Sequence, residues 1–94
     1  MSEQASLLAI VQGRVQGVYF RAFVRNHAEA LGLKGYVRNL SGGRAIEVRA
    51  EGEKTRLDEL LSHLNIGPTR AKVEHVETKW SEYTGRFKDF QLRY

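Results

Sequence analysis

Apolar and polar positions divide this chain into strand-like and helix-like segments. In the segment Arg44–Ala50 and the residue after it, the apolar Ile46, Val48 and Ala50 alternate with the polar Glu47, Arg49 and Glu51, the pattern of a strand with one buried face. Over Phe20–Leu31 and again over Glu53–Leu64, apolar side chains recur at three- and four-residue spacing. That spacing is typical of helices with one face in a core. The pattern therefore predicts one clear strand and two amphipathic helices.

Branched and aromatic residues indicate further strands between and beyond the helices. The expected segments are Ala5–Gly13, Lys34–Leu40, Ala71–Trp80 and Phe87–Tyr94. In the third of them, Val73 and Val76 are three residues apart, which breaks strict alternation and predicts a β-bulge. The last segment either continues the strand before it or pairs separately at an edge of the sheet.

The order strand, helix, strand, strand, helix, strand predicts an α+β fold. We expect a ferredoxin-like split β-α-β sandwich, with an antiparallel sheet and both helices on one face. The polar face of Arg44–Ala50, with Glu47 and the following Glu51, is expected to contact water. Residues 1–94 are expected to form a single domain, with residues 1–5 as a flexible N-terminal tail. This fold has many functions, so it does not identify one.

Composition and charge narrow the possible ligands. Fifteen basic and eleven acidic side chains give a net charge of +4, which favours anionic ligands. There is no cysteine, which excludes disulfides and thiolate chemistry and suits a cytoplasmic location. The apolar run Leu7–Val11 is too short for a signal core or a membrane span.

The three histidines form no metal-ligand motif. His27, His63 and His75 lie far apart in sequence, and no metal site or cofactor is predicted. We expect His27 to be packed in the interior and the other two to lie on the surface. The aromatic residues Trp80, Phe87, Phe90 and Tyr94 are expected in the core or on a face of the sheet.

The stretch GRVQGVYFR, Gly13–Arg21, connects the first strand to the first helix. A helix N-terminus carries unpaired N–H donors and partial positive charge, which suits an anion. Gly13 and Gly17 allow a sharp backbone path, and the planar guanidinium of Arg21 can bind two phosphate oxygens. The alternative is an ordinary glycine turn with a surface arginine, and the spacing alone favours that alternative.

A second stretch, GYVRNLSGG, Gly35–Gly43, places Asn39 just before a hairpin turn. An amide offers both a donor and an acceptor, so it can orient a water molecule, although these residues are also good turn formers. Neither stretch contains Asp, Glu or His, so a phosphate site built from them has no general base. Such a site suits a substrate with a good leaving group, as in an acyl phosphate.

The two stretches together resemble acylphosphatases, and the similarity covers nearly all of the chain. The resemblance implies a metal-free hydrolase without a cofactor that cleaves acyl phosphates to carboxylate and phosphate. It implies that Arg21 binds the phosphoryl group and that Asn39 orients the attacking water. It also implies that the phosphate contacts mainly the backbone of one loop, made of Arg14, Val15, Gln16, Gly17, Val18 and Tyr19. The substrate phosphate is then expected to accept the proton of the water.

Two positions depart from the family pattern. Tyr19 stands where glycine or phenylalanine is frequent, which is expected to affect which acyl groups fit. The hairpin Gly43–Ile46 has one extra residue. We expect a monomer that binds an acyl phosphate and inorganic phosphate, with no nucleic-acid partner and no membrane. Two alternatives remain: a nucleic-acid-binding module, favoured by the sequence pI near 9.7, and a regulatory domain that binds phosphorylated metabolites without turnover.

Overall fold

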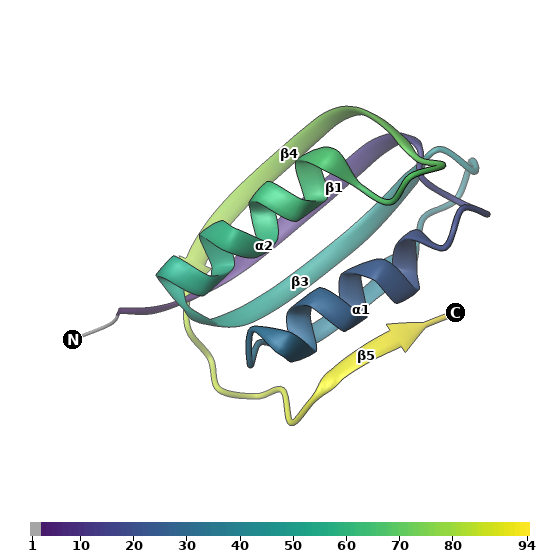
Figure 1. Cartoon of the computed structure of the whole chain (residues 1–94). Coiled ribbons are helices and arrows are strands. Elements are labelled where there is room, and N and C mark those ends of the chain that lie inside the picture. Colours follow the sequence, from purple (N-terminus) through teal and green to yellow (C-terminus); the bar gives the residue numbers. More distant parts are fainter. Residues whose placement is uncertain (1–2) are drawn as a thin grey trace.

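The computed structural model describes residues 3–94 and contains every expected helix and strand (Figure 1). In chain order these are β1 Gln4–Arg14, α1 Phe20–Ala30, β2 Lys34–Asn39, β3 Ala45–Glu53, α2 Lys54–Ile66, β4 Lys72–Glu82 and β5 Phe90–Arg93. No end differs from the expected one by more than three residues. The predicted tail is shorter than residues 1–5, because Gln4 and Ala5 already pair with Glu53 and Gly52 of β3. Residues 1 and 2 lie outside the described residues.

The five strands form one sheet in the order β4-β1-β3-β2-β5. All neighbouring pairs are antiparallel except β2 and β5, so the predicted antiparallel sheet is confirmed with one parallel pair at its edge. The last strand is therefore a separate edge strand. Its direction follows from the end of β4, which lies at the same end of the sheet as the start of β2. A chain that crosses there to the other edge must run alongside β2 in the same direction (Figure 1).

Both helices cover one face of the sheet, which confirms the ferredoxin-like α+β fold (Figure 1). The core lies between them and the inward side chains of the strands. It comprises Leu7, Ala9, Val11, Val15, Phe20, Val24, Ala28, Leu33, Val37, Ile46, Val48, Ala50, Leu57, Leu60, Leu64 and Phe90. The alternation predicted for β3 is confirmed, because Ile46, Val48 and Ala50 are all buried. Each fully buried valine, leucine, isoleucine or phenylalanine side chain stabilises the fold by roughly 1.5–3 kcal/mol.

The β-bulge lies where the valine spacing predicts it. The register of β1 against β4 shifts between Gln12, which pairs with His75, and Gly13, which pairs with Val73. Gly13 has φ 133°, and a Cβ there would collide with the carbonyl oxygen of Lys72. A glycine is therefore required at this point, where β1 bends close to β4 just before the loop to α1.

Glu51 is buried, which corrects the expectation that it contacts water. It is 3% exposed because the segment after β4 lies over it. The hydroxyl of Thr84 donates to Oε2 at 2.9 Å, and the N–H of Gly85 donates to Oε1 at 3.0 Å. Burial alone would raise the pKa of Glu51, but these donors outweigh that effect and hold its pKa below the usual range.

Some side chains are placed differently from expectation. Phe90 is in the core, whereas Tyr94 is 99% exposed at the end of β5. His27 is partly buried as expected, but His63 is not a free surface residue, because its ring stacks on His27 with 3.8 Å between centroids. Burial, and secondarily the charge of His63, lower the pKa of His27. The two rings thus join α1 to α2.

We predict that Thr84→Val lowers the free energy of unfolding by about 1–2 kcal/mol at neutral pH, because a buried carboxylate loses a charged hydrogen bond. The pKa of Glu51 is lowered on folding, so this contribution is complete above the ordinary carboxyl pKa and is lost as the pH falls through the lowered value. Urea denaturation at neutral and acid pH measures it. Thr84→Ser keeps the hydroxyl and should match the wild type; an equal loss in both variants contradicts the assignment.

Candidate active site

The loop Val15–Tyr19 joins β1 to α1 and presents unpaired backbone donors. The first backbone hydrogen bond of the helix is donated by the N–H of Phe23 to the carbonyl of Tyr19, at 3.0 Å. Within residues 3–94, the N–H groups of residues 15–22 donate no hydrogen bond to the protein, and no side chain caps the helix. Val15 is buried and anchors the loop, while Gly17 has φ 71° and open space around it. These free donors can bind an anion.

Tyr19 holds an unusual backbone conformation next to these donors. Its φ of 68° and ψ of 17° are left-handed, which costs roughly 1–2 kcal/mol for a residue with a Cβ. Its side chain is 84% exposed, so side-chain burial provides little compensation for that cost. Such strain is often retained near functional sites, because it directs the backbone groups of the loop.

Arg21 lies in the first turn of α1 and is held by the end of the chain. Its Nη1 donates to the carbonyl of Arg93 at 2.8 Å, and its guanidinium carbon lies 4.7 Å from the centroid of the Tyr94 ring. A cation at a helix N-terminus is opposed by the helix dipole, so these two contacts offset an unfavourable position. Sequence reasoning missed Arg93 and Tyr94, because no local pattern indicates that β5 passes the start of α1.

Asn39 ends β2 on the face of the sheet that the helices cover, two residues beyond the buried Val37. Its Oδ1 is buried and accepts no hydrogen bond from any described residue. Leaving such an acceptor unpaired costs about 1–3 kcal/mol, so a buried atom of this kind calls for an explanation. The Asn39 side chain also lines the cavity described next, so a small rotation of its amide would let a water molecule supply the missing donor.

Arg21 and Asn39 line one cavity of about 230 Å³. The rest of its lining is Val15, Gly17, Tyr19, Phe20, Ala22, Leu92 and Tyr94. The structure thus brings five of the sequence-predicted site residues together at one end of α1. The other three do not line the cavity: Arg14 is exposed on β1, Val18 packs against the core, and the Gln16 side chain points to the hairpin between β2 and β3.

The cavity combines backbone and guanidinium donors with the side-chain amide of Asn39. No Asp, Glu or His lines it, so its own groups offer positioning and positive charge rather than proton transfer. Over residues 3–94, no group of three or more His, Cys, Asp or Glu side chains could hold a metal ion. In the same part of the chain, no helix is long and apolar enough to cross a membrane.

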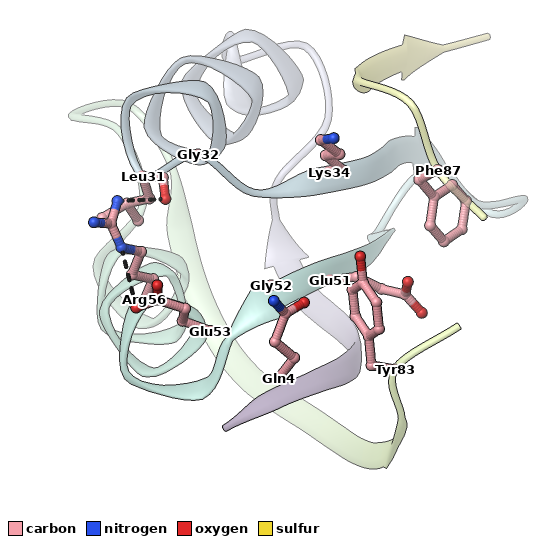
Figure 2. Close-up of a pocket in the computed structure, with 10 residues that line it drawn as sticks. All are labelled: Gln4, Leu31, Gly32, Lys34, Glu51, Gly52, Glu53, Arg56, Tyr83 and Phe87. Carbon is pink, nitrogen blue, oxygen red and sulfur yellow. Dashed lines mark hydrogen bonds and ion pairs between the residues drawn. The ribbon is translucent and has the colours of Figure 1, made fainter. Parts of the chain in front are cut away.

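A second cavity, of about 290 Å³, lies at the opposite ends of α1 and β2 (Figure 2). None of the predicted site residues lines it. Two of its four charged side chains are carboxylates, Glu51 and Glu53, which disfavour an anion. Its Arg56 already donates to the carbonyl of Leu31 at 3.0 Å and pairs with Glu53, while Lys34 has no partner among the described residues. The first cavity is therefore the better candidate for an anionic ligand.

This chain is similar to several known proteins that carry the same description. A family model described as acylphosphatase matches residues 7–92. An acylphosphatase of Dehalococcoides mccartyi is 51% identical over 88 residues, which cover 94% of this chain and 97% of that protein. One of Pyrobaculum aerophilum is 41% identical over 90 residues, covering 96% and 95%. The crystal structure of acylphosphatase from Bacillus subtilis superposes with a TM-score of 0.91 at 33% identity, covering 96% of this chain and 99% of that one.

Proposed function

We propose roles in catalysis for residues of the cavity that Arg21 and Asn39 line, on the basis that the chain belongs to the acylphosphatase family, whose members are hydrolases acting on acyl phosphates. The phosphoryl group lies in the loop Val15–Tyr19, Arg21 binds its oxygens, and Asn39 holds the attacking water. The observation that carries this proposal is the shared cavity, in which free N–H groups, a guanidinium and an unpaired amide oxygen meet.

The loop and Arg21 stabilise charge on the phosphoryl group. Free N–H groups at a helix N-terminus are oriented before the substrate arrives, so no reorganisation is needed when charge develops on the oxygens. Arginine has five N–H donors, and the contact with the Arg93 carbonyl uses one at Nη1. The remaining donors can bind two phosphoryl oxygens while that contact persists.

Asn39 orients the nucleophile. Its Oδ1 accepts a hydrogen bond from a water molecule, which directs an oxygen lone pair at phosphorus. A bond forms between the water oxygen and phosphorus as the bond from phosphorus to the carboxylate oxygen breaks, and the carboxylate leaves with that electron pair. The leaving group needs no proton, and the proton of the water passes to a phosphoryl oxygen. Catalysis of this kind depends mainly on positioning and charge stabilisation.

The finer assignments from the sequence stay predictions. These are independence from metal ions, a cytoplasmic location, a monomeric state and the absence of a nucleic-acid partner. The net charge of +4 suits small anions such as acyl phosphates and inorganic phosphate.

We predict that Arg21→Ala lowers kcat for benzoyl phosphate by more than the ~10²–10³-fold that loss of one oxyanion-stabilising donor costs. Arg21→Lys should also be severely impaired, because an ammonium does not reproduce the planar pair of donors. Arg25→Ala, in the same helix but outside the cavity lining, should retain activity. Steady-state hydrolysis rates with a check of folding by circular dichroism measure this. Turnover near that of the wild type in Arg21→Lys excludes the assigned role.

We predict that Asn39→Ala lowers kcat by about 10²-fold with little change in KM, because the water loses its orienting acceptor while phosphate binding is retained. The free energy of unfolding should not fall, since the substitution removes a buried unpaired oxygen. Kinetics and urea denaturation of the same sample give both values. A variant affected through KM alone would assign Asn39 to substrate binding instead.

We predict that an excess of EDTA leaves kcat and KM unchanged, because the proposed charge stabilisation uses only protein donors. Inorganic phosphate should inhibit competitively, since it can occupy the same loop. The assay compares EDTA-treated and untreated protein, and then tests whether added Mg²⁺ or Zn²⁺ restores any lost rate. Metal-dependent recovery would contradict the proposed mechanism.

A further inference from the structure

The side chain of Gln16 connects the loop to the hairpin that follows Asn39. Its Nε2 donates to the carbonyl of Leu40 at 2.8 Å and to the carbonyl of Ala45 at 2.9 Å. A side-chain amide has two N–H donors, so both of them are used. Leu40 directly follows Asn39, and its N–H donates to the Ala45 carbonyl at 2.9 Å, which closes the base of the hairpin. Gln16 thus binds the point where β2 ends and β3 begins.

Few other polar contacts fix the loop relative to Asn39. The backbone N–H groups of residues 15–22 donate to no described residue, and nothing lies within 4 Å of where a Cβ on Gly17 would be. Gln16 itself is only partly buried. The N–H of Gly13 donates to the carbonyl of Arg44 at 2.9 Å and so fixes the end of β1 before the loop begins. Within the loop itself, the two short hydrogen bonds of Gln16 are the polar link to the strand end that carries Asn39.

This link determines a distance that the reaction requires. The loop N–H groups hold phosphorus and Asn39 holds the water, so the separation of the two segments sets the approach of the water to phosphorus. A misplacement of about 1 Å can cost ~10²-fold in rate. Supporting hydrogen bonds are the usual means by which a site keeps such precision.

We infer that the Gln16 side chain is a positioning residue, which holds the loop and Asn39 at the separation that hydrolysis requires. The inference rests on the proposed roles of the loop and of Asn39. The side chain acts at the side of the loop turned toward the hairpin, where it contacts backbone carbonyls and not the substrate. Its backbone N–H remains one of the free donors of the loop.

A double-mutant cycle between Gln16→Met and Asn39→Ala tests the inference. Methionine has a similar length and no N–H donors. In the wild-type background, Gln16→Met should lower kcat for benzoyl phosphate by about 10²-fold. In the Asn39→Ala background, adding Gln16→Met should lower kcat by less than about twofold, because Asn39 no longer holds a water that the substitution could misplace. The inhibition constant of inorganic phosphate should change by less than about threefold.

The cycle separates failure of the inference from failure of the proposed function. If Asn39→Ala is slow and Gln16→Met costs the same factor with and without it, Gln16 is only structural and the inference is overturned while Asn39 keeps its role. If Asn39→Ala itself turns over normally, the proposed function fails first. A weakened inhibition by phosphate as large as the loss in kcat would assign Gln16 to phosphate binding.

A second variant keeps the test decisive if Gln16→Met folds poorly. Gln16→Glu has the same shape, but its ionised carboxylate faces two carbonyl oxygens and donates to neither. On acidification the carboxyl group becomes protonated and regains one donor, so its kcat relative to the wild type should rise by at least about tenfold from pH 8 to pH 5. Gln12→Glu adds the same charge at an exposed position of β1 and should show no such rise. A constant ratio for Gln16→Glu, or an equal rise in both variants, overturns the inference.

Discussion

An anion site made of backbone N–H groups requires that those groups have no partner within the protein. The loop Val15–Tyr19 meets this requirement, since the first helical hydrogen bond is donated only by Phe23. Unpaired donors leave the loop without the bonds that usually fix a backbone. Other contacts supply that order: Val15 is buried below the loop, Gly13 bends β1 at the bulge, and Gln16 binds the hairpin.

The same requirement explains why charged and strained groups gather at this end of α1. Arg21 lies against the positive end of the helix, and the carbonyl of Arg93 and the ring of Tyr94 offset that position. Asn39 keeps an unpaired oxygen, and Tyr19 keeps a left-handed backbone. The last two features lower stability in the absence of a ligand, and under the proposed function all three prepare the cavity for a phosphoryl group and a water. The core between sheet and helices provides the stability that permits this.

Much of the fold followed from local patterns in the sequence. The leucine stripe of α2, the alternation in β3 and the valine spacing at the bulge are all local signals, and each predicted its element correctly. The contacts that the sequence did not reveal join residues far apart along the chain. Glu51 is covered by the segment at Thr84, and β5 pairs in parallel with β2 at the far edge. Gln16 was predicted only as part of the backbone of a phosphate loop, because the partners of its side chain at Leu40 and Ala45 depend on tertiary structure.

The position of β5 at the edge of the sheet also affects the order in which the proposed site forms during protein synthesis. Arg21 and its carbonyl partner on Arg93 are 72 residues apart in sequence, so the contact closes most of the chain into a loop. Ribosomal synthesis delivers the loop, Arg21 and Asn39 well before β5. A nascent chain can therefore form α1 and the hairpin while its arginine is still unrestrained. Under the proposed function, the phosphate site is therefore complete only after β5 has left the ribosome and docked beside β2.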